Sequence, residues 1–340
     1  MYSCWPYSGF VDGCYYITIP HPEVSSMFLR FLLTLVCGLG LSFSVAAATP
    51  SVLTTIKPLQ LIAAAVLDGI AEPEVLLPPA ASPHNYALRP SDRRQIAAAD
   101  RLYWVGPELE RFLQRLLDNQ PAARRLDQIP GLTLRSYGDH PHATDHGHDH
   151  AAHSHDGHEH DDHDHAPGTL DPHIWLSTDN AQRIALWMAE DLGQLYPEHQ
   201  QRLQHNAVQF SQRLEQLHTQ LQQRLQPLTD KPYFVFHDAY GYLEDSIGIH
   251  PRGVFTLSVE VQPGARHTQA LRQQLTAAGP SCVFREPQFP ADRIATLSAG
   301  LPVRNAELDP LGIAVTPGPA GYEQLLNTLG TTLAECLEQL

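Results

Sequence analysis

The sequence predicts an α/β protein with two similar lobes, each built on a mainly parallel sheet, that are joined by a long rigid helix. Three observations support this fold class. Strand-like and helix-like segments alternate in both halves of the chain, as in parallel sheets covered by helices on both faces. One uninterrupted helical pattern separates the halves. The 340 residues, 43% of them hydrophobic, exceed the ~250 residues at which one core usually stops growing.

The first half shows the alternation directly after its leader. Apolar and β-branched runs indicate strands, and apolar residues spaced three or four apart indicate helices. We expect strands at 51–56, 75–79 and 101–105, and helices at 59–67, 91–99 and 107–117. These elements predict an N-terminal lobe at residues 49–197.

A long amphipathic helix is predicted at 198–226, between the two lobes. Its apolar positions recur every three or four residues, and the stretch 198–225 contains neither Gly nor Pro. These positions are Leu203, Ala207, Phe210, Leu214, Leu217, Leu221 and Leu225. At ~1.5 Å per residue, the helix would extend about 40 Å, which is enough to run along both lobes.

The second half repeats the alternation and predicts a C-terminal lobe at 227–340. We expect strands at 233–236, 253–257 and 282–284, and helices from about 240, at 268–278, after Pro290 and at 321–340.

The leader, residues 1–48, contains a secretory signal. From Met27 it has a basic residue, an apolar stretch and an Ala46-x-Ala48 ending, so we expect cleavage after Ala48 and a periplasmic protein. A membrane anchor is the alternative, but the apolar run is short for a span of ~20 residues and no stop-transfer charges follow it. Residues 1–26 resemble no leader, which makes Met27 a better start than Met1.

The cysteines indicate one disulfide. Cys4, Cys14 and Cys37 precede the expected cleavage point, so the mature chain keeps only Cys282 and Cys336. In an exported protein, two cysteines favour a disulfide over two free buried thiols. Closing a loop of about 54 residues would stabilise the fold by roughly 4 kcal/mol on the chain-entropy model, before native strain is subtracted.

The formal net charge of −15 argues against nucleic acids and anionic membranes as partners and is compatible with attracting cations. A segment at 139–165 is rich in His and Asp and poor in large apolar residues, so we expect a disordered loop with many weak metal sites. Its histidines are His140, His142, His146, His148, His150, His153, His155, His158, His160, His163 and His165.

A solvated linker or an added tag would also explain this segment, although its aspartates and internal position argue against a tag. Our hypothesis is that it gathers zinc when the metal is scarce or senses the zinc level.

Three separate histidines lie where open α/β sheets place ligands, in loops and at strand ends. His84 lies in a loop between a strand and a helix, and His237 ends a predicted strand. His173 follows Asp171, whose carboxylate could orient the imidazole. Each histidine alone is more often structural, but their shared setting points to a tetrahedral zinc site.

Five ordered motifs make the resemblance to a known family specific. They are Ser82–Asp92 (SPHNYALRPSD), Asp171–Leu176 (DPHIWL), Phe236–Tyr242 (FHDAYGY), Cys282–Phe289 (CVFREPQF) and Leu308–Gly312 (LDPLG). The mature chain resembles the substrate-binding proteins of high-affinity zinc ABC transporters, a ZnuA-like group within the cluster A-I metal-binding family. This resemblance implies an inter-lobe cluster of His84, His173 and His237, a Cys282–Cys336 disulfide and a long helix between the lobes. It also implies a membrane permease as the partner, and we expect a monomer.

The motifs also bear on the metal. Manganese-binding relatives typically have Glu where His237 stands, and imidazole suits zinc better than manganese. Some zinc members carry an acidic residue before the first histidine, but Pro83 occupies that position here. The aspartate of the Leu308–Gly312 motif is a ligand in manganese-binding relatives, so the resemblance implies Asp309 as the protein candidate for the fourth ligand, and water is the alternative.

We expect no enzyme but a protein that captures transported Zn²⁺ and delivers it to a permease. A zinc hydrolase is an alternative, because three histidines and a water also describe catalytic zinc sites. The sequence lacks His-Glu-x-x-His, and neither Glu244 nor Glu286 can be placed as a general base. A periplasmic store or chaperone for zinc, nickel or copper is the other alternative, and it rests on the His-rich segment alone.

Overall fold

The computed structural model describes residues 49–79, 81–137, 168–256, 265–289 and 297–340. The expected signal, the first three cysteines, the segment 139–165 and most of the helix expected after Pro290 lie outside these residues. Within the described part, none of the helices combines the length and the apolar character that crossing a membrane requires.

Two four-stranded parallel sheets confirm the predicted fold class. The first consists of β1 (Val52–Thr54), β2 (Glu74–Val75), β3 (Arg101–Trp104) and β4 (Ala123–Arg125) in the order β2-β1-β3-β4. The second consists of β5 (Tyr233–His237), β6 (Gly253–Thr256), β7 (Ser281–Arg285) and β8 (Val303–Glu307) in the order β6-β5-β7-β8. The strand order repeats, so the two lobes have the same sheet topology.

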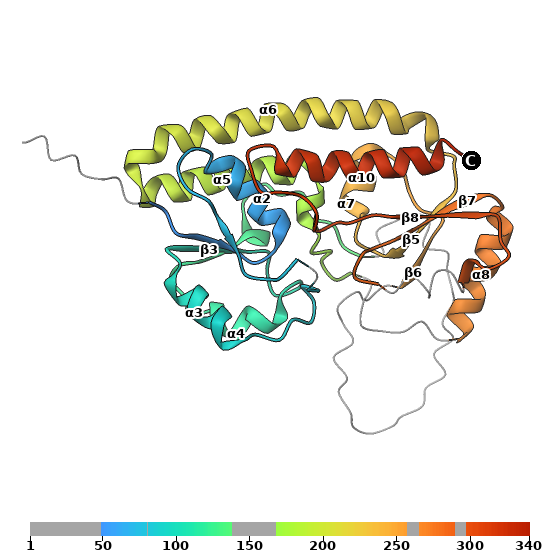
Figure 1. Cartoon of the computed structure of the whole chain (residues 1–340), viewed down its shortest axis with the longest axis horizontal. Helices are drawn as coiled ribbons and strands as arrows, with labels where there is room; N and C mark the ends of the chain where they lie inside the picture. The colour runs from blue at the N-terminus through green and yellow to red at the C-terminus, as the bar shows by residue number, and fades with distance from the viewer. Residues whose placement is uncertain (1–48, 80, 138–167, 257–264, 290–296) are drawn as a thin grey trace, which may run out of the picture. The chain divides into compact units, whose positions relative to one another are not determined.

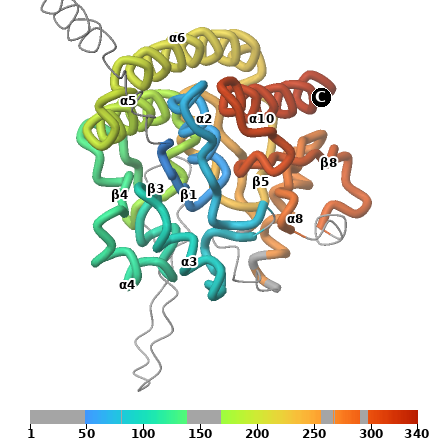
Figure 2. The backbone as a smooth tube through the Cα atoms, turned by 60° about the vertical axis from the view of Figure 1, so that its left-hand side comes forward, coloured from blue at the N-terminus to red at the C-terminus, as the bar shows by residue number. Residues whose placement is uncertain are grey.

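Helices lie on both sides of the sheets (Figures 1 and 2). They are α2 (Lys57–Val66), α3 (Pro90–Ala98), α4 (Gln114–Leu117), α5 (Thr178–Leu195), α6 (Gln200–Leu225), α7 (Gly241–Ile247), α8 (Ala265–Ala278) and α10 (Gly321–Leu337). In Figure 2, α6, α5 and α10 gather on one side of the strands, whereas α3 and α4 lie on the other.

The long helix α6 runs along both lobes (Figure 1). It packs against α5 and α2 of the first half and against α10 and α7 of the second. All seven apolar positions named above are buried, and they form its inner face. One main apolar core contains residues of both halves, from Val52 to Leu337. Separating the lobes would expose this shared core, which makes a large opening motion costly.

The first half departs from the prediction in three elements. The helix expected at 107–117 is wrong in length, because helical turns begin only at Arg111. Just before Arg111, the Glu110 carboxylate accepts hydrogen bonds from the Thr55 hydroxyl and the Gly106 N–H. These bonds hold residues 107–109 in a turn instead of a helix. The 18-residue helix α5, capped by the Ser177 hydroxyl, and the short strand β4 were both missed.

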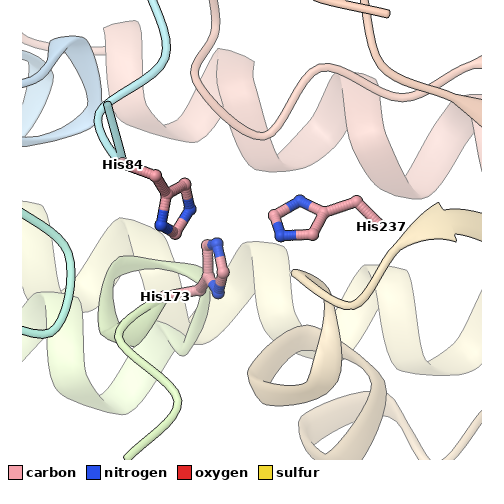
Figure 3. Close-up of side chains that lie close together, drawn as sticks. All are labelled: His84, His173 and His237. Atoms are coloured by element: carbon pink, nitrogen blue, oxygen red, sulfur yellow. The ribbon is translucent and has the colours of Figure 1, made fainter. Parts of the chain in front are cut away.

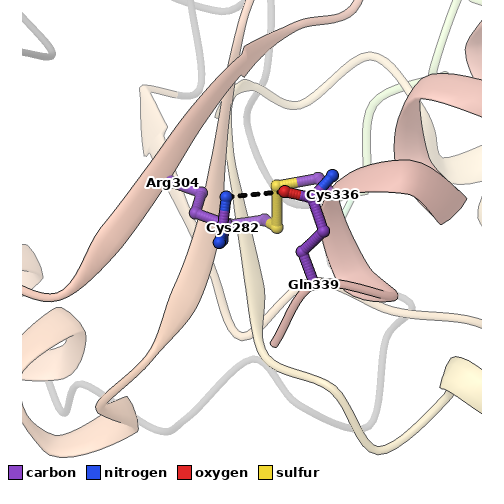
Figure 4. Close-up of a disulfide and its surroundings, with 4 residues drawn as sticks. All are labelled: Cys282, Arg304, Cys336 and Gln339. Atoms are coloured by element: carbon purple, nitrogen blue, oxygen red, sulfur yellow. Dashed lines mark hydrogen bonds between the residues drawn. A yellow bond between two sulfur atoms is a disulfide. The ribbon is translucent and has the colours of Figure 1, made fainter.

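The predicted disulfide between Cys282 and Cys336 is present and joins β7 to α10 (Figure 4). The two Cα atoms lie 6.2 Å apart. Beside it, Arg304 of β8 donates a hydrogen bond of 2.6 Å to Gln339, just after α10. The last helix is therefore fastened to the second sheet while it also packs against α2 and α6.

Candidate metal centre

The structure brings His84, His173 and His237 together from three distant places in the sequence (Figure 3). One ligand atom from each lies within 4.8 Å of the other two. The ring centroids are 5.1 Å apart for His173 and His237, and 5.6 and 5.7 Å from His84 to these two. Among the described residues, no other group of three His, Cys, Asp or Glu side chains has this arrangement.

The three imidazoles line a cavity of about 230 Å³. Because a water molecule takes about 30 Å³ of liquid, this volume accommodates an ion with several waters. His84, in the loop between β2 and α3, is half-buried, whereas His173 and His237 are each only 2% exposed. The cavity is also lined by Ser82, Pro83, Asn85, Trp175, Glu286, Gln288, Phe289, Pro310 and Leu311.

His173 is held by Asp171, as the sequence predicts. The Nδ1 atom of His173 lies 2.8 Å from Oδ1 of Asp171, and the same oxygen accepts the backbone N–H of His173 at 3.0 Å. The Tyr137 hydroxyl is 3.4 Å from both Nδ1 of His173 and Oδ1 of Asp171. With Nδ1 engaged, Nε2 is the nitrogen left for coordination.

Arg135 neutralises the buried Asp171 and links the two lobes. Its guanidinium donates to Asp171 at 2.8 Å and, through Nε, to Asp245 of α7 at 3.1 Å. The Tyr242 hydroxyl, also on α7, joins the backbones of residues 135 and 171. A Cβ at Gly241 would overlap the Arg135 guanidinium, so a larger residue there would displace Arg135 from its present contacts.

His237 is held in a similar way by Glu286, which sequence reasoning left unplaced. Nδ1 of His237 lies 3.0 Å from Oε1 of Glu286, and both side chains are buried. Val235 of β5 pairs with Phe284 of β7. The parallel register therefore puts residues 237 and 286 side by side at the carboxyl ends of these two strands. Knowledge of the strand order would have revealed this contact, since both residues sit at strand ends.

The pKa values of the two buried histidines move in opposite directions. Burial, followed by the nearby His237 and Arg135, lowers the pKa of His173 well below its usual value. Burial also lowers the pKa of His237, but the charge and hydrogen bond of Glu286, with Asp238 and Asp171, outweigh burial and raise it. His173 is therefore neutral at physiological pH, and His237 holds its proton to a higher pH.

Asp309, one of the two expected fourth ligands, does not join the three histidines. Its carboxylate accepts the backbone N–H groups of Leu311 and Gly312 at 3.0 Å each, and that of Ile313 at 2.5 Å. The Leu308–Gly312 motif therefore shapes a loop, whose Pro310 and Leu311 form part of the cavity wall.

The described residues that flank the segment 138–167 are hydrogen-bonded to each other next to His173. The Gly168 N–H donates to the Tyr137 carbonyl at 2.8 Å, and Ser136 and Leu170 form an antiparallel bridge. The Asp171 N–H then donates to the Arg135 carbonyl at 2.9 Å. The two paired stretches, 135–137 and 168–171, therefore carry the groups that hold His173.

Comparisons with known proteins give the arrangement its context. The family model "ZnuA: Zinc-uptake complex component A periplasmic" matches residues 52–336. The "High-affinity zinc uptake system protein ZnuA" of Yersinia pestis is 40% identical over 301 residues, which cover 86% of this chain and 92% of that protein. The protein of the same name from Haemophilus ducreyi is 38% identical over 316 residues, with coverages of 92% and 100%.

A solved structure described as "Crystal structure of ZnuA" has the same fold, with a TM-score of 0.68 at 22% identity. The match covers 85% of this chain and 100% of that one. The family model and the two relatives each account for most of the sequence. The chain is therefore a member of the ZnuA family of zinc-uptake complex components.

Proposed function

We propose that this protein binds one Zn²⁺ ion through His84, His173 and His237 and delivers it to the membrane permease of a zinc ABC importer, without catalysing a reaction. The observation that carries this proposal is the convergence of three imidazoles, two of them fixed by carboxylates through Nδ1. The names of the relatives, as zinc-uptake proteins, support the same cargo and role.

The donor set favours zinc. Imidazole nitrogens suit zinc, whereas manganese and magnesium prefer oxygen ligands. The two nearest carboxylates, Asp171 and Glu286, accept hydrogen bonds from the histidines, which fixes the tautomers and turns each Nε2 toward the ion. Because Asp309 is engaged by three backbone amides, we propose that water fills the fourth position.

Delivery requires little movement of the lobes in this account. The helix α6 packs against both lobes, and their shared core resists opening, so we propose that small shifts around the cavity accompany zinc binding. The loaded protein, a monomer, would then dock on the permease. A large change in solution scattering on zinc binding would contradict this part of the proposal.

The cellular location follows from the leader. We propose export to the periplasm, with the signal removed after Ala48. The description of the family as periplasmic supports this location. The Cys282–Cys336 disulfide does so too, because an oxidising compartment favours disulfides. Sequencing the N-terminus of the exported protein would identify the cleavage point.

The segment 139–165 is proposed as an accessory that gathers zinc for the three-histidine site or reports its level. We expect its deletion to disturb the rest of the fold little, because residues 137 and 168 on either side are hydrogen-bonded to each other. If the deletion left both zinc stoichiometry and uptake at limiting zinc unchanged, this role would be wrong.

Calorimetric zinc titration of the 139–165 deletion variant tests the function. We expect one tight site, which His173→Ala or His237→Ala removes and which the exposed control His205→Ala on α6 retains. Loss of all tight binding on deletion would favour a metal store or chaperone instead. Hydrolytic turnover that disappears in His173→Ala would favour the hydrolase.

A further inference from the structure

The turn after β7 carries two polar side chains that line the cavity, Glu286 and Gln288. A hydrogen bond of 3.1 Å from the Phe289 N–H to the Glu286 carbonyl closes the turn. Glu286 holds His237 through Nδ1, as described above. Gln288 has no corresponding partner.

Both polar atoms of the Gln288 side chain are buried, and neither Nε2 nor Oε1 has a hydrogen-bond partner among the described residues. A buried amide without partners is unfavourable, and native proteins rarely retain one without an unseen water or ion that satisfies it. The side chain lines the cavity with the three histidines, so such a partner would lie in that cavity.

Much of the remaining wall gives a water little to bind. Trp175, Phe289, Pro310 and Leu311 present mainly apolar surface. Oε1 of the Glu286 carboxylate is engaged by His237, the Ser82 hydroxyl accepts the His84 N–H at 3.3 Å, and the other amide on the wall, Asn85, is exposed. A water held in a cavity needs two to four polar partners. The Gln288 amide is well suited to be one of them.

We propose that Gln288 positions the water that completes the zinc coordination sphere, with Oε1 accepting a hydrogen bond from that water. Three imidazoles leave one tetrahedral position. A water bound there through oxygen still has two hydrogens to donate, and Oε1 is a neutral acceptor for one of them. Gln288 is then a positioning residue that acts through the water. This inference rests on the proposed function and deepens it.

The test uses the full mature chain and less metal than protein, so that the tightest site fills first. Zinc affinity is measured by competition with a chromophoric chelator. Azide affinity is measured from the visible spectrum of the Co²⁺-loaded protein, in which azide replaces the bound water. We compare Gln288→Leu, which removes the acceptor, with Gln288→Glu, which keeps an acceptor oxygen. Gln324→Leu, at an exposed position of α10, is the matched control.

We expect Gln288→Leu to weaken zinc binding about 10-fold or more, as loss of a group that supports a metal ligand does. Azide should bind the cobalt site several-fold more tightly, because the water it replaces has lost its acceptor. Gln288→Glu should restore much of the zinc affinity, and Gln324→Leu should change nothing. The metal-free Gln288→Leu variant should unfold at the same temperature as the native protein or higher, since a buried unpaired amide is removed.

Unchanged zinc and azide affinities would overturn the inference. Weaker zinc binding together with a lower unfolding temperature and unchanged azide affinity would make Gln288 structural and would also overturn it. Failure of the proposed function is a separate result, because the native protein itself would then bind zinc without using the three histidines.

Discussion

His173 and His237 have nearly the same surroundings but opposite electrostatics. Each is 2% exposed, and each places Nδ1 at 2.8 to 3.0 Å from a carboxylate oxygen. Burial lowers both pKa values, yet the pKa of His173 ends well below its usual range and that of His237 above it.

The opposite pKa shifts arise from the groups that contact the two carboxylates. Asp171 is paired with Arg135, so its charge is largely neutralised, and the guanidinium itself disfavours a protonated His173. In the described part of the chain, Glu286 has no ion pair with an arginine or a lysine. The same hydrogen-bond geometry therefore gives one histidine with a lowered pKa and one with a raised pKa, and under the proposed function only His237 must release a proton before it binds zinc.

The largest expected effect comes from removing a ligand. Structural zinc sites with four ligands contribute roughly 10–16 kcal/mol, or about 3 kcal/mol per ligand, which corresponds to a loss of affinity of about 100-fold or more. We expect such losses for His173→Ala and His237→Ala in the 139–165 deletion variant, measured by chelator competition. Losses of zinc affinity of less than about tenfold in both variants would show that the two histidines are not zinc ligands.

Removing either carboxylate should cause a smaller loss of zinc affinity than removing a histidine. The two carboxylate variants should differ in their free energy of unfolding. We expect Asp171→Asn and Glu286→Gln each to weaken zinc binding by about 10- to 100-fold. Asp171→Asn also removes the buried carboxylate that pairs with Arg135 at 2.8 Å, so the free energy of unfolding of the metal-free protein should fall by about 3 kcal/mol.

Glu286→Gln leaves no buried charge behind, and we expect a loss of about 1 kcal/mol in the free energy of unfolding. Urea denaturation measures both values. Equal losses of the free energy of unfolding in Asp171→Asn and Glu286→Gln would show that the pairing of Arg135 with Asp171 does not make the two histidine–carboxylate pairs different.

The pH dependence of zinc binding should follow His237. Its folded pKa lies above the usual value, so the protonated form persists to a higher pH and competes with zinc. Affinity should be full above that pKa and should fall by up to about tenfold per pH unit below it, because one proton must be released.

His173, whose pKa is lowered, contributes no such loss near neutrality. Glu286→Gln removes the charge that contributes most to raising the His237 pKa, so the fall should begin at a lower pH in this variant. Calorimetry across the pH range from 5.5 to 8 tests the shift, and identical profiles would argue against it.

The sequence predicted which histidines lie together better than it predicted the groups that hold them. The three histidines and Asp171 lie in short local contexts, at strand ends or within two residues of a ligand, and such contexts can be recognised in a linear sequence. Arg135 is separated from Asp171 by the His-rich segment, and Glu286 meets His237 only through the pairing of β5 with β7. Neither contact can be found without the tertiary structure.

The fold, too, could be predicted only where local sequence patterns are clear. Three strands of each sheet and the helix α6 follow from apolar periodicity, but β8 was missed because its sequence, Val-Arg-Asn-Ala-Glu, is polar and largely exposed. Asp309 was proposed from its motif, and the carboxylate instead binds three backbone amides, a local arrangement that the motif alone does not specify.

The smallest effect on zinc affinity should come from the disulfide. Reducing it, or replacing both cysteines by serine, should lower the free energy of unfolding by about 4 kcal/mol on the chain-entropy model. Zinc affinity should remain nearly unchanged, because the bridge joins β7 to α10 and neither cysteine is among the described residues that line the cavity. A large loss of affinity in protein that is still folded would show that β7 needs the bridge to place Glu286.

The most direct test of the central claim is X-ray absorption at the zinc edge, recorded on the 139–165 deletion variant loaded with less than one equivalent of zinc. The account predicts three imidazoles and one oxygen at about 2.0 to 2.1 Å, and loss of this signature in His173→Ala. Fewer than three imidazoles in the native site, or the same spectrum from His173→Ala, would contradict it.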